Sequence, residues 1–347
     1  MEASLATGPV GVRTIRTTDY HTAGEPFRIV TDPVPTHGGT VAERRVHAID
    51  DPELDNLRQV LCFEPRGHAD MYGGFITPPD DDGADFGVLF WHKDGFSTAC
   101  GHGTIALGAW AIETGRVPID PSGTTEVVID VPSGRVTARV HTEDHTVVSV
   151  DFVNVASYVL HTEVPMAWNG HETTAEVVFG GAIYAHVRAA DLGLAVEPEH
   201  ITDLIAAGRH IKWALNDTEN AEHPTDDRLS GIYGTILYDD LGTDDRDNPH
   251  QRNVTVFADG EVDRSPCGSG TASRVAALWS EGHLTEQQHL VHDSVVSTRF
   301  IARVLATVEE AGHPAVIPSI TGMAYRTGEH TFHVDPRDTV NPGFVLR

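Results

Sequence analysis

Two of the three cysteines in this 347-residue sequence lie in the same short pattern. Cys-Gly-x-Gly-Thr occurs at Cys100–Thr104 and again, 167 residues later, at Cys267–Thr271. The similarity continues beyond the motif, because an alanine follows each cysteine by nine positions and a glycine follows it by fifteen, at Gly115 and Gly282. Two copies spaced by about half the chain indicate an internal duplication, and hence two similar lobes.

Each cysteine is placed where a helix is expected to begin. Small residues follow it, then an apolar stretch such as Ile105–Ile112, then the glycine, which suits the left-handed conformation after a helix. The stretch 105–112 has no charge on any face, so this helix is predicted to be buried. Because a helix N-terminus favours anions, we expect the thiol pKa of Cys100 and Cys267 to fall below about 8.5.

The backbone beside the cysteines is also suited to holding a carboxylate. The candidate donors are the N–H groups of Gly101, His102, Gly268 and Ser269. If the duplication brings both helix starts to one small anion, one thiolate can remove a proton from a carbon while the other thiol delivers a proton to its opposite face. This would invert a stereocentre without a cofactor, with on the order of 10²–10⁴ in rate from each acid–base group and further stabilisation from the carboxylate donors.

Other chemistries fit the sequence less well. A cysteine–histidine hydrolase would use Cys100 and His102, but residues two apart at a helix start rarely face each other, and this reading leaves Cys267 unexplained. The 21 histidines form no His-Glu-x-x-His, and there is no Cys-x-x-Cys, so no metal is expected. The glycine-rich loops lack the Lys-Ser/Thr of a phosphate-binding loop, so nucleotide binding is not expected. A thiol–disulfide switch would be a side reaction. Cys62 is interpreted as a small hydrophobic residue of the core.

Composition excludes several classes of partner. With 24 Lys and Arg against 51 Asp and Glu, the formal net charge of −27 opposes binding to nucleic acid or an anionic membrane, and indicates a solvated acidic surface, as in proteins adapted to high salt. No apolar run approaches the roughly 18 residues of a membrane span, and no targeting segment is visible, so a cytoplasmic protein is expected.

The remaining pattern is mostly that of strands. The segments interpreted as strands are 14–18, 26–31, 40–48, 87–91, 126–130, 135–141, 146–152, 180–187, 232–238 and 253–258. Residues 51–62 and 201–207 are predicted to be helical, and 239–250 a charged loop.

Several motifs together resemble those of a known family. They are His21–Pro26, Glu64–His68, Cys100–Gly103, Gly180–Ala182 and Asp263–Gly270, and they run in order through nearly the whole chain. The sequence resembles the proline racemase family, which includes hydroxyproline 2-epimerases and trans-3-hydroxyproline dehydratases. The resemblance implies an α/β fold with two pseudo-symmetric lobes, each a curved, mostly antiparallel sheet around a central helix, with the active site between them, as in diaminopimelate epimerase. The first lobe is then expected at 1–148, with 336–347 returning to it, and the second at 149–335.

The resemblance also implies roles for residues. Cys100 and Cys267 become the catalytic proton-transfer groups, His102 and Asp263 the groups that hold the ring nitrogen, and the backbone at Gly101, Gly268 and Ser269 the carboxylate site. Dehydratases of the family carry Thr where this sequence has Cys267, and elimination needs a base on one face only.

The expected function is therefore a cofactor-independent isomerase, a racemase or 2-epimerase of free proline or 4-hydroxyproline. The alternatives are a trans-3-hydroxy-L-proline dehydratase and, from another class, a non-catalytic amino-acid-binding protein. The expected partner is the small-molecule substrate, with neither nucleic acid nor membrane, and a homodimer is compatible with the family.

Overall fold

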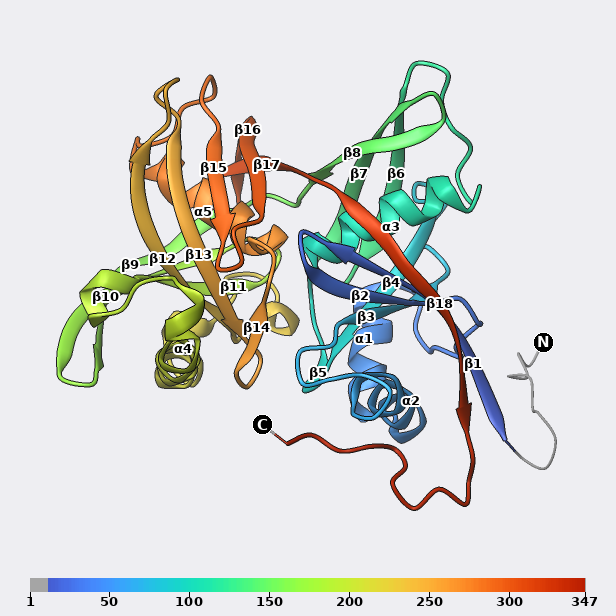
Figure 1. Ribbon diagram of the computed structural model, residues 1–347. Helices are drawn as coiled ribbons and strands as arrows, with labels where there is room; N and C mark the ends of the chain where they lie inside the picture. The colour runs from blue at the N-terminus through green and yellow to red at the C-terminus, as the bar shows by residue number, and fades with distance from the viewer. Residues whose placement is uncertain (1–11, 347) are drawn as a thin grey trace. The chain divides into compact units, whose positions relative to one another are not determined.

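The computed structural model describes residues 12–346 (Figure 1). Residues 1–11, which open the expected first lobe, and residue 347 lie outside this range. By its internal contacts the chain divides into two compact units. Unit 1 contains the residues up to Thr22, Pro26–Val147 and the residues from Ala324 onward, and unit 2 contains Ala23–Glu25 and Val148–Met323.

The α/β fold expected from the sequence is present, with a large mixed sheet and few helices. Unit 1 contains β1 (Arg13–Thr22), β2 (Glu25–Val30), α1 (Val41–Asp50), α2 (Pro52–Cys62), β3 (Gly73–Thr77), β4 (Phe86–His92), β5 (Gly95–Phe96), α3 (Gly101–Glu113), β6 (Thr124–Val131), β7 (Gly134–Glu143) and β18 (Ala324–Val334), with β8 (Thr146–Val153) leading out of it. Its strands pair in the order β18–β1–β2–β3–β4–β6–β7, and β5 pairs with β4.

Unit 2 continues the chain. It contains β9 (Tyr158–Trp168), β10 (His171–Phe179), β11 (Ile183–Arg188), α4 (Ile201–Asn216), β12 (Ile232–Thr243), β13 (Pro249–Phe257), β14 (Glu261–Asp263), α5 (Gly268–Ser280), β15 (Leu290–Ser294), β16 (Arg299–Glu310) and β17 (His313–Gly322), with short 3₁₀ turns at Ala189–Leu192, Pro198–His200, Glu219–Ala221 and Asp227–Leu229. The pairing order is β9–β10–β11–β12–β13–β15–β16–β17–β8, and β14 pairs with β13.

The two units share a pattern of pairing around their cysteine helices. In unit 1, β2 runs parallel to β3 and β4 parallel to β6, with antiparallel pairs between and after them. In unit 2, β11 and β12, then β13 and β15, repeat this alternation. A short hairpin, β4–β5 or β13–β14, precedes a 13-residue helix in each unit. This is the structural counterpart of the repeated motif.

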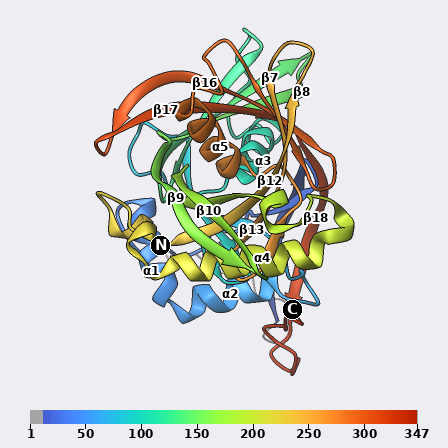
Figure 2. The same ribbon diagram turned by 90° about the vertical axis from the view of Figure 1, so that its left-hand side faces the viewer.

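Both cysteine helices are buried by the sheet of their own unit. In α3, every residue from Gly101 to Ile112 is buried, and the helix packs against β1, β6, β7 and β18 (Figure 1), as its uncharged sequence predicts. In α5, Gly268 to Leu278 are buried against β9, β10, β16 and β17. The other helices cover further sheet surface, with α1 and α2 on β4, and α4 on β12 and β13 (Figure 2).

The segment 40–48 was predicted as a strand, and this is wrong. It forms the helix α1, because Thr40 and Glu43 make a capping box in which the Thr40 side chain accepts from the Glu43 amide and the Glu43 carboxylate accepts from the Thr40 amide. Val41, Arg44 and Ala48 then form its buried face at helical spacing.

Two other expectations need correction. The segment 239–250 is not all loop, because β12 continues to Thr243 and β13 begins at Pro249. Residues 324–335 were assigned to the second lobe, but β18 pairs along its length with β1 and so belongs to unit 1. Within the described residues, no helix is long and apolar enough to cross a membrane.

Candidate active site

Cys100 is the N-cap residue of α3. Its backbone is extended, with φ −155° and ψ 101°, so its side chain turns back over the first helical turn and its Sγ accepts a hydrogen bond from the Gly103 amide at 3.2 Å. Its carbonyl accepts from the Thr104 amide at 3.0 Å and from the Thr104 hydroxyl at 2.8 Å. This is the usual geometry of a side-chain N-cap, in which the sulfur lies where a helix favours negative charge.

His102 lies directly against this sulfur. Its Nε2 and Nδ1 are 3.5 and 3.6 Å from Cys100 Sγ, and its ring packs edge-on against Tyr72 with the centroids 5.0 Å apart. The argument that residues two apart at a helix start rarely face each other is therefore wrong here. The extended N-cap backbone folds the cysteine side chain over the turn that contains the histidine.

Cys267 begins α5 in a different conformation. Its φ of +63° with ψ of 115° lies in the region that non-glycine residues rarely adopt. The side chain is buried, with the Tyr184 hydroxyl 3.9 Å from Sγ. The same hydroxyl lies 2.7 Å from Ser269 Oγ, so Tyr184 joins the cysteine to the first turn of α5.

The thiol of Cys267 does not follow the expectation of a lowered pKa. Burial, followed by the nearby negative charge of Asp263, raises the pKa of Cys267 above its ordinary value, although a hydrogen bond from the Gly270 backbone acts in the opposite direction. The helix N-terminus is outweighed because desolvation and a like charge both disfavour the thiolate. Cys267 is thus a neutral thiol at physiological pH.

Asp263 ends β14 and is buried beside the cysteine motif. Its Oδ1 accepts hydrogen bonds from the Ser265 amide at 2.8 Å and the Ser265 hydroxyl at 2.7 Å. Ser265 Oγ in turn accepts from the Cys267 amide at 3.0 Å. A buried carboxylate fixed on one oxygen in this way is suited to pairing with an ammonium group.

The structure therefore collects the candidate residues into two groups, one in each unit. Cys100, Gly101 and His102 form the start of α3 in unit 1, and Asp263, Cys267, Gly268 and Ser269 form the start of α5 in unit 2. The first-turn N–H groups of an α-helix have no carbonyl four residues earlier to donate to, which is why a helix N-terminus can hold a carboxylate.

Comparison with known proteins identifies the family. The family model described as proline racemase matches residues 17–345. The chain belongs to the proline racemase family. It is 43% identical to a trans-3-hydroxy-L-proline dehydratase of Bacillus cereus over 331 residues, which is 95% of this chain and 97% of that protein. It is 42% identical to a 3-hydroxyproline 2-epimerase of Burkholderia multivorans over 337 residues, which is 96% of this chain and 99% of that protein.

Solved structures of proline racemase relatives have the same fold. A hydroxyproline epimerase from Agrobacterium vitis with bound trans-4-hydroxy-L-proline superposes with a TM-score of 0.88 at 28% identity, covering 96% of each chain. A probable proline racemase from Agrobacterium radiobacter with bound carbonate gives 0.89 at 28% identity, again with 96% of each chain. The chain is therefore an enzyme of a family of amino-acid isomerases.

Some residues beside these two groups were not assigned a role from the sequence. Ser265 lies inside the quoted motif 263–270, and Tyr184 follows the motif 180–182 by two positions, so both were within reach of the motif argument. Glu25, in the motif 21–26, is buried, and its Oε2 accepts from the Arg264 amide at 2.7 Å, which links two motifs far apart in the sequence. Only the folded chain shows this link.

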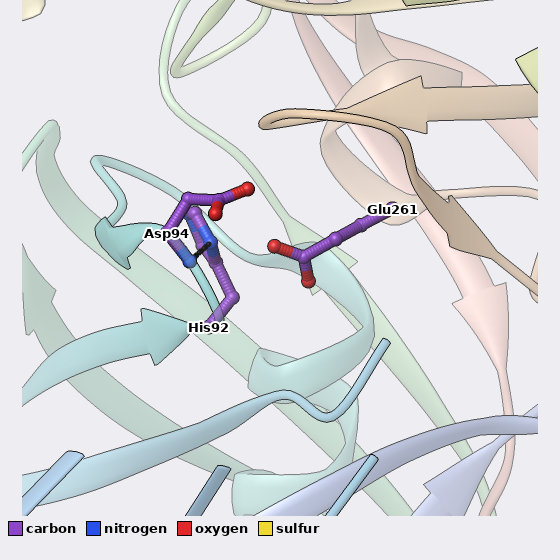
Figure 3. A group of neighbouring side chains, drawn as sticks. All are labelled: His92, Asp94 and Glu261. Carbon is purple, nitrogen blue, oxygen red and sulfur yellow. Dashed lines mark hydrogen bonds between the residues drawn. The ribbon is translucent and has the colours of Figure 1, made fainter. Parts of the chain in front are cut away.

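The β4–β5 turn of unit 1 places two possible metal ligands together. The Asp94 amide donates to His92 Nδ1 at 3.2 Å, as Figure 3 shows. Glu261, also drawn there, belongs to unit 2, where it is the first residue of β14. Among residues 12–346, no three potential ligands within a single unit come close enough to one another to hold a metal ion.

Proposed function

We propose that this protein is a cofactor-independent 2-epimerase of a free hydroxyproline, with Cys100 and Cys267 as the two proton-transfer groups. One observation supports this above the others, which is that each half of the duplicated chain has a cysteine at the start of a buried 13-residue helix. An enzyme that removed a proton from one face only would need one such cysteine. Inversion needs two groups, a base and an acid.

The two sulfurs suit complementary roles. The Gly103 amide donates to Cys100 Sγ, which stabilises negative charge there, whereas Cys267 is a buried thiol beside a carboxylate. In one direction the Cys100 thiolate takes the α-proton and becomes a thiol, the carbon holds the electron pair as a carbanion, and the Cys267 thiol returns a proton to the opposite face and becomes a thiolate. The reverse direction exchanges the roles, and the number of protons is unchanged after each turnover.

The rest of the site would hold the zwitterionic substrate. We assign its carboxylate to the first-turn N–H groups at Gly101, Gly268 and Ser269, and its ammonium to Asp263 and His102. An ammonium beside Asp263 would offset the charge that raises the pKa of Cys267. Substrate binding would then bring this thiol closer to a pKa at which it can exchange protons.

The names of the relatives support a hydroxyproline substrate. Relatives at 42–43% identity are named for 3-hydroxyproline, and a structural neighbour holds trans-4-hydroxy-L-proline. We therefore place 3-hydroxyproline first, with 4-hydroxyproline and proline as the alternatives expected from the sequence.

A trans-3-hydroxy-L-proline dehydratase is the second candidate. It is favoured by the naming of several relatives, including one from Colwellia psychrerythraea at 39% identity. Elimination would use one cysteine as the base that breaks the C2–H bond. A C2–C3 double bond would form, and the 3-hydroxyl would leave as water with the proton that this cysteine has taken. This reaction has no use for a proton donor at position 267.

The test is a panel of L-proline, trans-3-hydroxy-L-proline and trans-4-hydroxy-L-proline in heavy water. Chiral chromatography measures inversion, mass spectrometry measures α-proton exchange, and reaction with o-aminobenzaldehyde detects a pyrroline. We expect exchange together with inversion of at least one hydroxyproline. Pyrroline without inversion would favour the dehydratase, and binding without exchange would indicate a non-catalytic amino-acid-binding protein.

Two further expectations from the sequence remain predictions. We propose a cytoplasmic location and a homodimer, which cell fractionation and sedimentation equilibrium would test.

A further inference from the structure

The peptide bond between Pro266 and Cys267 is held from both sides. Its carbonyl oxygen accepts hydrogen bonds from Asn253 Nδ2 at 2.8 Å and from Thr271 Oγ1 at 3.0 Å. Its N–H donates to Ser265 Oγ at 3.0 Å. Asn253, Thr271 and Ser265 are all fully buried, so these bonds do not compete with water.

His292 completes this arrangement from behind. Its Nδ1 is 2.8 Å from Thr271 Oγ1, and its Nε2 is 2.6 Å from Asn253 Nδ2. Because the Thr271 hydroxyl donates to Pro266, the consistent assignment is an Nδ1–H that donates to Thr271 and an Nε2 that accepts from Asn253. Burial lowers the pKa of His292 to about 3, so this neutral tautomer persists at physiological pH.

The first half of the chain has no counterpart to this arrangement. The closing pairs of the two hairpins, His92–Gly95 and Phe257–Glu261, align Asn253 with Val88. The parallel pairs of β4 with β6 and of β13 with β15 likewise align His292 with Ile129. Thr104 corresponds to Thr271, but its hydroxyl donates to the carbonyl of Cys100 itself. Cys100 also has an ordinary extended backbone, whereas Cys267 has φ +63°. The fold of this segment therefore does not by itself require the additional hydrogen bonds.

The hydrogen bonds account for the unusual conformation. A residue with a side chain stays at such a φ only when its surroundings hold it there, and positions of this kind concentrate at functional sites. With both polar groups of the preceding peptide fixed, its plane cannot rotate to relieve Cys267. The Ser265 hydroxyl also donates to Asp263, so one side chain relates the position of the cysteine to that of the proposed ammonium ligand.

We propose that Ser265, Asn253 and Thr271, supported by His292, are positioning residues that hold Cys267 in the orientation needed for proton transfer. This inference rests on the proposed epimerase function. None of the four is assigned contact with the substrate. Their effect is to fix the position of the Cys267 sulfur. Because the first half has no such residues, their substitution should change proton transfer by Cys267 and leave proton transfer by Cys100 unchanged.

Thr271→Val tests the proposal by removing one hydroxyl without changing the size of the side chain. Thr271→Ser keeps the hydroxyl. The matched control is Thr235→Val, because Thr235 is also fully buried in unit 2 and its hydroxyl donates to the Gly208 carbonyl at 2.9 Å. Both valine variants should lose similar thermal stability. We expect kcat for inversion to fall 10- to 100-fold in Thr271→Val with KM within threefold, and to stay within threefold in Thr271→Ser and Thr235→Val.

The deciding measurement is the ratio of α-proton exchange to inversion in heavy water, starting from each C2 epimer. With Cys267 displaced, Cys100 still removes the α-proton from one epimer. The Cys100 thiol then exchanges this proton for deuterium from the solvent and returns the deuterium to the same face of the carbon. That epimer should show at least a fivefold higher ratio of exchange to inversion than in the wild type. Equal losses of exchange and inversion from both epimers would overturn the proposal, since a general loss of structure predicts that result.

Different results would contradict the positioning role and the epimerase function. If the wild type exchanges no α-proton from any amino acid of the panel, the epimerase function is wrong. The positioning role is then still tested by iodoacetamide, with Cys267 labelling followed by peptide mass spectrometry. Release of the held backbone should raise the Cys267 labelling rate at least threefold in Thr271→Val and not in Thr235→Val. An unchanged rate would overturn the positioning role.

Discussion

The starts of α3 and α5 show what the two halves of this chain share and where they differ. Both helices are 13 residues long, buried, and preceded by a short hairpin. At the first, the cysteine has an ordinary N-cap conformation and its sulfur accepts from a backbone amide. At the second, the cysteine has a left-handed φ and lies beside a carboxylate. The sheet and helix common to both units set the place of each sulfur. Its surroundings then differ, with the Gly103 amide at Cys100 and with burial and the Asp263 carboxylate at Cys267.

The difference matches a division between base and acid. A sulfur that receives an N–H hydrogen bond is stabilised as an anion, whereas a desolvated sulfur near a carboxylate is kept as a thiol. The most direct test of this difference is to remove each sulfur in turn.

Cys100→Ser and Cys267→Ser should each lower inversion at least 10³-fold, because a serine hydroxyl is a far weaker acid than a thiol and each direction needs both groups. Chiral chromatography of the product measures this. The matched control is Cys62→Ala, since Cys62 is buried outside both motifs and its thiol contacts the Met71 carbonyl. That variant should keep inversion within threefold. Substantial inversion by either serine variant would contradict the two-cysteine proposal.

Asp263→Asn should have the next largest effect, and its two readouts should move in opposite directions. Loss of the carboxylate that pairs with the ammonium should lower kcat/KM about 10²–10³-fold. Removal of the like charge should lower the pKa of Cys267, so that iodoacetamide labels this thiol faster at pH 8.

Asp259→Asn is the control for this change. Asp259 is in the same unit but pairs with Arg209 at the surface, at 2.7 Å. Neither readout should change. Slower labelling of Cys267 in Asp263→Asn would show that the carboxylate does not hold the thiol in its neutral form.

The features predictable from the sequence are those with a local pattern. The repeated motif located both helix starts, the uncharged stretch predicted the buried α3, and Gly115 and Gly282 have the expected positive φ of 69° and 76°. The helix α1 was missed because its alternating apolar residues suggested a strand while the Thr-x-x-Glu cap was overlooked. The raised pKa of Cys267 was missed because it depends on burial and on Asp263, which no spacing rule weighs against a helix dipole.

The roles of the residues around Pro266 were still harder to predict from the sequence. Asn253 is on β13 and His292 on β15, and they meet only because these strands pair in parallel. A lone asparagine and a lone histidine among 21 give no motif. Their role depends on tertiary structure, which is also why the duplication alone suggested two equivalent cysteines.

Acid should weaken the second half through His292. Its pKa is about 3 in the folded protein and about 6.5 in an unfolded chain, so the unfolded state binds one more proton between these values and stability falls as pH falls. From pH 6.5 to pH 5 this single group should lower the free energy of unfolding by about 1.5 kcal/mol. Urea unfolding at each pH would measure it.

His292→Thr is the control variant, since a threonine side chain takes up no proton in this pH range. The variant should be less stable at pH 7 but should show a smaller loss between pH 6.5 and pH 5 than the wild type. The same pH dependence in both proteins would mean that His292 does not stay neutral in the folded state.

The smallest effect concerns the opposite ends of the same helices, where the two halves agree. Gly115 and Gly282 follow the C-caps of α3 and α5, and their amides donate to Ile112 and Trp279, each at 3.0 Å. An added Cβ would meet no atom within 4 Å at either position, so the cost of alanine comes only from the positive φ. Gly115→Ala and Gly282→Ala should each lower the free energy of unfolding by about 1 kcal/mol, as measured in urea. Equal losses in the free energy of unfolding would mean that α3 and α5 differ at their N-terminal cysteines and not at their C-termini. Losses that differ by more than about 1 kcal/mol would show that the two helices differ along their whole length.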